Sequence, residues 1–181
     1  MYYLRKIYDW TLKKSNHPRA TWFLATISFA ESSFFPIPPD IILIPMVLAK
    51  KTKAFFFALL CTLSSVTGGI LGYLFGLLLF NSIGVLLINF YHLDGAVNEF
   101  RNYYNSYGPW IIVIAGFTPF PFKVITITSG LFQLNIIVFI LFSLISRGAR
   151  FYLVSGLLYF YGENIKNLID KYFNFLTILF L

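Results

Sequence analysis

Residues 31–40 read Glu-Ser-Ser-Phe-Phe-Pro-Ile-Pro-Pro-Asp, and this stretch lies between two apolar runs at residues 22–30 and 41–49. Each run is about half as long as a membrane-spanning helix, which needs roughly 20 residues. The stretch contains three helix-breaking prolines, Pro36, Pro38 and Pro39. Proline removes an amide donor and pushes the residue before it out of the helical region, and a broken backbone at membrane depth is tolerated only where protein or water lines it. The pattern therefore predicts a re-entrant helical hairpin over residues 20–49, and the alternative is one tilted spanning helix with a proline kink.

The composition places the chain in the integral membrane class. Of its 181 residues, 58% are hydrophobic and 12% are charged, and the mean hydropathy is +0.75. Much of the net charge of +7 lies in short patches beside apolar segments, which is typical of cytoplasmic loops rather than of a nucleic-acid groove. His17 and His92 lie far apart without ligand neighbours, and no Ser-His-Asp set or phosphate loop is apparent. We therefore expect no nucleic-acid partner, no metal, no cofactor and no enzyme activity.

Basic residues flank the first hairpin on both sides. Arg19 and four earlier cations precede it, and Lys50, Lys51 and Lys53 follow it. Because loops rich in Lys and Arg stay in the cytoplasm, both ends of the segment belong on the same side, as a re-entrant hairpin requires. Residues 1–19 are expected to form an amphipathic helix in the membrane interface, and a solvated helix is the alternative.

Residues 54–79 carry no charge and are long enough to cross a bilayer. Glycine recurs there at every fourth position: Gly68, Gly72 and Gly76. Such a stripe of small residues lets a neighbouring backbone approach closely. We expect it to pack against a hairpin of the same chain, and a dimer interface is the alternative.

The second half of the chain repeats this order. Residues 80–107 are more polar and slightly acidic, so we expect them on the outer side. A second hairpin is predicted over residues 109–135, where two prolines break a pair of short apolar runs. These prolines are Pro119 and Pro121. Residues 136–161 are predicted to form a second span, and the tail at 162–181 is expected in the interface because its apolar run is too short to cross.

The order of these elements predicts an all-α integral membrane protein. An interfacial helix, a re-entrant hairpin and a full span occur twice over, with the first hairpin entering from the inside and the second from the outside. This order matches an inverted repeat, in which the functional site lies near the midplane of the membrane. Both termini are then expected in the cytoplasm.

Five ionisable residues fall inside the apolar segments: Glu31, Asp40, Lys123, Arg147 and Arg150. A charge at membrane depth is costly unless it is paired or hydrated, so such residues commonly mark transport pathways. One interpretation is a structural network of ion pairs that holds the hairpins to the second span. The other is that the three cations receive a phosphate group while the two acids serve as protonatable partners.

Four motifs occur in order along the chain. They are Glu31 with residues 36–40, the glycines from 68 to 76, Thr118-Pro119 with Lys123 and Ser129-Gly130, and Ser146-Arg147 with Arg150. Together they resemble the DedA family of membrane proteins (VTT, or SNARE-associated, domain), and especially its YqaA-like branch. The resemblance covers roughly residues 20–160 and implies two opposed re-entrant hairpins, with the five ionisable residues as the transport site. Many family members have arginine where this chain has Lys123, and an ammonium lacks the bidentate fork of arginine, so the lipid class stays open.

The resemblance also implies a function. It implies a multi-pass protein of the bacterial inner membrane that acts as a flippase or scramblase for phospholipids or polyprenyl phosphate lipids, with proton coupling left open. Its partners are then membrane lipids with an anionic or phosphate head group. Two alternatives use the same charges differently: a transporter of a small solute or ion, and a structural or assembly protein that transports nothing.

Overall fold

The computed structural model describes residues 18–180 except 35–37, 86, 87, 89, 91–93 and 119. This part of the chain is helical and contains no β-strand, which confirms the predicted all-α class. The elements in order are α2 (Pro18–Ser33), α3 (Asp40–Ala49), the 3-10 turn η1 (Lys51–Lys53), α4 (Ala54–Leu79), the π-helical turn η2 (Phe80–Gly84), α6 (Asp94–Phe117), α7 (Phe122–Leu131) and α8 (Ile136–Phe180). Pro36, Pro119 and most of the predicted N-terminal helix lie outside the described residues.

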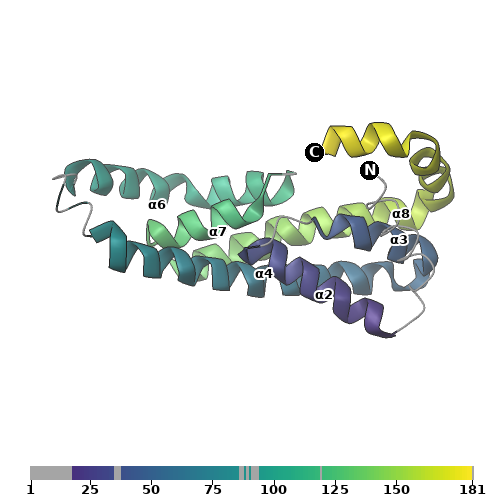
Figure 1. Ribbon diagram of the computed structural model, residues 1–181, viewed down its shortest axis with the longest axis horizontal. Coiled ribbons are helices and arrows are strands. Elements are labelled where there is room, and N and C mark those ends of the chain that lie inside the picture. Colours follow the sequence, from purple (N-terminus) through teal and green to yellow (C-terminus); the bar gives the residue numbers. More distant parts are fainter. Residues whose placement is uncertain are drawn as a thin grey trace.

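Two helices are long and apolar enough to cross a membrane, in agreement with the two predicted spans. They cover Lys51–Ser82, with 32 residues, and Ile136–Gly162, with 27 residues. At about 1.5 Å per residue, either one can cross the roughly 30 Å of bilayer hydrocarbon. Figure 1 shows α4 and α8 side by side along the long axis of the molecule, with the shorter helices packed along them.

The helices α3 and α7 are short because the chain breaks before each of them. Each has ten residues, which is about half of a membrane span. Pro39 stands directly before α3 and Pro121 directly before α7, where the missing amide donor costs no helical hydrogen bond. Because α7 begins at Phe122, Lys123 lies in the first turn of that helix, directly after the break.

The glycines of α4 lie where other helices cross it. A Cβ atom added to Gly68 would collide with the backbone carbonyl of Phe29 in α2. A Cβ atom added to Gly72 would collide with the side chain of Thr126 in α7, and one added to Gly76 would collide with the backbone of α7. The stripe therefore lies at contacts within one chain, because the absence of side chains lets these backbones approach closely.

Two apolar clusters fill the interior, one toward each end of the α4–α8 pair. The first joins α2, α3, α4 and α8 and includes Leu43 and Phe57. The second joins α4, α6, α7 and α8 and includes Tyr73 and Phe139. Buried polar side chains separate the clusters near the middle of α4 and of the apolar part of α8, and these side chains form the candidate site.

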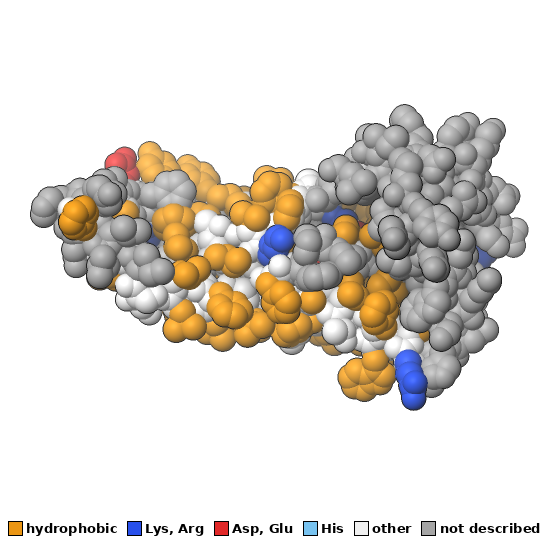
Figure 2. All heavy atoms as spheres, viewed as in Figure 1, with side chains coloured by type: hydrophobic (Ala, Val, Ile, Leu, Met, Phe, Trp, Pro, Cys, Tyr) orange, Lys and Arg blue, Asp and Glu red, His pale blue; other side chains and the backbone are white. Residues whose placement is uncertain are grey.

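The outer surface of the two long helices is apolar as well. Large hydrophobic side chains that are at least half exposed include Leu63, Leu78, Ile137 and Leu141. Figure 2 shows hydrophobic side chains spread over the middle of one face of the molecule. A water-soluble monomer rarely exposes so much contiguous apolar surface, so this surface is typical of helices that face lipid.

Two helices run through boundaries that the sequence predicted. The helix α6 continues from the predicted outer segment into the first arm of the second hairpin, through Pro109. Proline deprives that turn of one hydrogen bond, but the turn is held by packing, because buried Gly108 lies close to Tyr104 and Leu134. The helix α8 likewise continues past Gly162 and bends toward its C-terminal end (Figure 1), so the expected tail begins inside a helix.

The glycine contacts can be tested by adding a single methyl group. Gly76→Ala is expected to destabilise the fold by roughly 1–3 kcal/mol, because backbone atoms of α7 cannot move aside easily. Gly156→Ala in α8 is the matched control, because nothing lies within 4 Å of its added Cβ, and it should be neutral or slightly stabilising. Thermal unfolding in detergent measures both, and equal unfolding temperatures for the two variants would contradict the contact.

Candidate functional site

Arg147 lies between the two apolar clusters, and its guanidinium is paired with Glu31. Nη2 of Arg147 donates to Oε2 of Glu31 at 2.6 Å, and Nε donates to Oγ of Ser65 at 2.7 Å. The side chains of Arg147 and Glu31 are 3% and 12% exposed. A buried charge destabilises a protein unless it is paired and hydrogen-bonded, so Arg147 at this depth requires these partners.

Two aromatic rings lie beside the same guanidinium. The ring centroids of Phe122 in α7 and Phe151 in α8 lie 4.9 Å and 4.7 Å from Cζ of Arg147. A cation is attracted to the face of an aromatic ring, and more strongly where water is excluded. Through these contacts one side chain of α8 touches α2, α4 and α7.

Serine hydroxyls support the carboxylate of Glu31. Ser32 Oγ donates to Glu31 Oε2 at 3.1 Å and lies 2.6 Å from Ser65 Oγ. Glu31 stands in the last turn of α2, where the helix dipole disfavours an anion. The carboxylate therefore depends on Arg147 and on Ser32 for its stabilisation.

Arg150, one turn further along α8, makes the second ion pair. Its Nη2 donates to Oδ2 of Asp40 at 2.6 Å. Its Nη1 donates to the carbonyl oxygens of Phe117, at 3.4 Å, and Thr118, at the C-terminal end of α6, where carbonyls lack helical partners. Asp40 begins α3, where the helix dipole favours an anion. Arg150 therefore connects the start of α3 with the end of α6, which border the two chain breaks.

The two ion pairs differ in how fully their polar atoms are bonded. Oδ1 of Asp40 and Nε of Arg150 are buried and have no hydrogen-bond partner among the described residues, whereas Nε of Arg147 is bonded to Ser65. The side chains of Arg150 and Asp40 are 14% and 17% exposed, so Arg150 is more accessible than Arg147. The second pair can therefore bond a further polar group while keeping the bonds that it already has.

The structure brings together four of the five ionisable residues predicted for the site. Lys123 is the exception: within the described part of the chain its ammonium group has no ion pair and no hydrogen bond, and its side chain is half-buried. The helix α7 contributes Thr126 instead, whose hydroxyl donates to the carbonyl of Ser32 at 3.1 Å. Among the described residues no group of three or more His, Cys, Asp or Glu side chains could hold a metal.

Sequence reasoning missed the uncharged members of the site. Ser65 lies three residues before Gly68 and so shares the face of α4 that the glycines define, which is a signal that could have identified it. Ser32 directly follows Glu31, but its contact with Ser65 depends on how α2 packs on α4. Phe122 carries no signal in the sequence that separates it from other apolar residues.

Similarity to known proteins extends over most of the chain. An uncharacterized protein of Haemophilus influenzae is 36% identical over 168 residues, which cover 91% of this chain and 85% of that protein. An uncharacterized protein of Histophilus somni, named as an HI0703 homolog, is 36% identical over 160 residues, which cover 87% of this chain and 82% of that protein. No family model and no solved structure matches the chain.

The difference between the two ion pairs predicts different costs for neutralising their acids. Glu31→Gln is expected to destabilise the fold by about 3–5 kcal/mol, because it leaves Arg147 as an uncompensated buried charge. Asp40→Asn is expected to destabilise it less, because Arg150 is more exposed and keeps its carbonyl acceptors.

Thermal unfolding of both variants measures this order. The double variant Glu31→Gln with Arg147→Met should recover much of the loss, since it removes the unpaired charge. A larger loss for Asp40→Asn than for Glu31→Gln would contradict the assignment of Arg147 as the structurally required cation.

Proposed function

The chain belongs to one family with the Haemophilus influenzae and Histophilus somni proteins, and we propose that it is a membrane protein that moves a lipid with a phosphate-bearing head group across the bacterial inner membrane. The observation that carries this proposal is the Asp40–Arg150 pair. It joins two chain breaks near the middle of the apolar helices, and it keeps a buried acceptor and a buried donor without a described partner.

In this proposal α2 with α3, and α6 with α7, are two re-entrant hairpins that enter from opposite sides and form an inverted repeat. Three observations support it. The helices α3 and α7 are too short to span, and the outward faces of α4 and α8 are apolar. Lys50, Lys51 and Lys53 stand directly before α4, as the positive-inside rule expects of a cytoplasmic end. Both termini then lie in the cytoplasm.

Arg150 is the proposed receptor for the phosphate group. Its guanidinium offers a planar fork that matches two phosphate oxygens, and the N-terminus of α3 adds a favourable dipole for an anion. Asp40 competes with the phosphate for the same guanidinium. Protonation of Asp40 removes that competition, so uptake of a proton by Asp40 favours binding of the lipid at Arg150 and provides a route to proton coupling.

The other two charged groups have different proposed roles. The Glu31–Arg147 pair is enclosed and holds the helices together while Arg150 exchanges partners. Lys123 carries a positive charge that no described acid neutralises, and a lipid phosphate near the second break would neutralise it. The same residues carry the resemblance to the DedA family, and we include membership of that family in the proposal.

Transport in proteoliposomes tests the role of Arg150. Arg150→Gln is expected to lower translocation of labelled phospholipid or polyprenyl phosphate at least about ten-fold, which corresponds to ~1.4 kcal/mol. Arg150→Lys should retain part of the activity, because it keeps the charge but loses the fork. Lys53→Gln, which removes an exposed cation at the end of α4, is the control, and all variants are matched by thermal stability. A wild-type rate for Arg150→Gln would exclude the phosphate site.

Proton coupling is tested with the acid that faces Arg150. Asp40→Asn is expected to remove the response of translocation to a pH gradient, because an amide cannot take up and release the proton. Translocation is compared with and without the gradient for the wild type and the variant. An unchanged gradient response in Asp40→Asn would contradict the role of Asp40 while leaving the phosphate site in place.

Cysteine labelling tests the hairpin topology. In a Cys61→Ser background, Arg19→Cys and Thr52→Cys are expected to resist a reagent added from the outside, because both flank the first hairpin on its cytoplasmic side. Asn102→Cys in α6, which is exposed, is expected to react. Reaction of only one of the first two positions would mean that residues 20–49 cross the membrane.

A further inference from the structure

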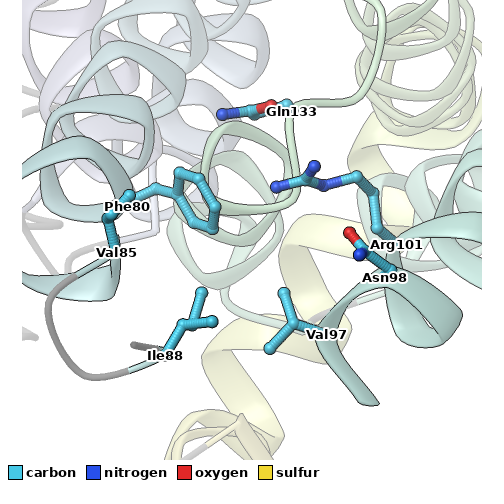
Figure 3. A pocket seen from close by; sticks show the side chains of 7 residues that line it. All are labelled: Phe80, Val85, Ile88, Val97, Asn98, Arg101 and Gln133. Carbon is cyan, nitrogen blue, oxygen red and sulfur yellow. The ribbon is translucent and has the colours of Figure 1, made fainter. Parts of the chain in front are cut away.

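A second site lies away from the ion pairs, at the end of α4 opposite Lys53. It is a cavity of about 210 Å³ between η2, the start of α6 and the turn after α7. Figure 3 shows the side chains that line it: Phe80, Val85, Ile88, Val97, Asn98, Arg101 and Gln133. Its position matters, because the apolar span that contains α4 ends at Ser82 in η2, and a spanning helix reaches the lipid head groups where its apolar stretch ends.

Among the described residues that line this cavity, Arg101 is the single charged side chain. Within the described part of the chain, its buried Nε has no hydrogen-bond partner and its guanidinium forms no ion pair. Its Cζ lies 4.9 Å from the ring centroid of Phe80, which orients the guanidinium but leaves its hydrogen-bond donors available. A buried polar group without a partner is uncommon in folded proteins and calls for an explanation.

Two amide side chains complete the polar part of the cavity. Asn98 lies on α6 beside Arg101, and Gln133 enters from the turn after α7 (Figure 3). Gln133 has a φ of 55°, a left-handed conformation that is uncommon for residues other than glycine. The turn is held by hydrogen bonds from Gln133 N to Gly130 O and from Leu134 N to Ser129 O, both at 3.0 Å, so the unusual backbone is fixed in place.

We propose that this cavity binds a phosphate-type anion, with Arg101 as the cation and the amides of Asn98 and Gln133 as further donors. An arginine fork and neutral donors are the chemistry that recognises phosphate oxygens. The remaining lining residues are apolar, which suits the hydrocarbon part next to a lipid phosphate. The bound phosphate group thus belongs either to a lipid head group, in the leaflet that surrounds the end of α4 opposite Lys53, or to free inorganic phosphate. This inference rests on the proposed placement of α4 across a membrane. It does not require that the protein transports a lipid.

Binding to the full chain tests the site in two arms. In one, nanodiscs of phosphatidylcholine contain or lack phosphatidylglycerol, and retained phosphatidylglycerol is counted by native mass spectrometry. In the other, inorganic phosphate is titrated calorimetrically into detergent-solubilised protein. Arg101→Gln is expected to weaken binding at least about ten-fold, and Val97→Phe should weaken it by filling the cavity without changing any charge. Lys53→Gln removes a cation from the other end of α4 and should bind as the wild type does.

The outcomes separate the two sources. Arg101-dependent retention of phosphatidylglycerol without phosphate binding assigns a lipid head group, and Arg101-dependent binding of inorganic phosphate assigns the free anion. Wild-type binding by Arg101→Gln in both arms, or an equal loss in Lys53→Gln, would overturn the site. Repeating the comparison in an Arg150→Gln background keeps this result separate from the proposed transport, because the Arg101-dependent difference should persist there.

Discussion

The buried guanidinium of Arg147 is the constraint on which the arrangement of the helices depends. A charge in an apolar interior is tolerated only where partners satisfy it, and here the partners are Glu31 in α2, Ser65 in α4 and the ring of Phe122 in α7. Because each partner belongs to a different helix, Arg147 sets the depth of α2, α4 and α7 relative to α8. Sliding one of them by a single turn, about 5.4 Å, would leave the charge without its acid, its hydroxyl or its ring.

The glycines of α4 make these contacts possible. Helices with ordinary side chains at the contact pack about 8–10 Å apart, and short serine side chains then meet poorly. Here Gly68 lets α2 approach so closely that Ser33 donates to the Gly68 carbonyl at 2.9 Å and the hydroxyls of Ser32 and Ser65 lie 2.6 Å apart. The glycine stripe and the polar layer are therefore one feature: small residues allow the close approach, and the close approach allows short hydroxyls to support a buried carboxylate.

Much of this arrangement follows from sequence rules, and the rest depends on tertiary packing. Apolar length predicts α4 and α8, proline predicts the breaks before α3 and α7, and the cost of charge in an apolar segment identifies the residues of both ion pairs. The pairing itself was not predictable, because Arg147 and Arg150 are one turn apart and the choice of acid depends on the relative depth of α2 and α3. Lys123 was grouped with the arginines by its charge and by the family resemblance, and neither reports which partners its ammonium group contacts. The passage of α6 through Pro109 depends on packing at Gly108 that local preferences do not report.

The two ion pairs place unequal limits on movement. Separating Glu31 from Arg147 leaves a charge that is 3% exposed, and such a state lies several kcal/mol above the paired one. Arg150 can leave Asp40 while its Nη1 stays bonded to the carbonyls at the end of α6, and its greater exposure lets another anion take the place of the carboxylate. The displaced Asp40 carboxylate would then be the unpaired ion, so the exchange avoids an unpaired buried charge only together with the protonation of Asp40 proposed above. A site that binds and releases a charged group inside apolar surroundings needs to avoid such a charge, and of these two pairs only Asp40–Arg150 can do so.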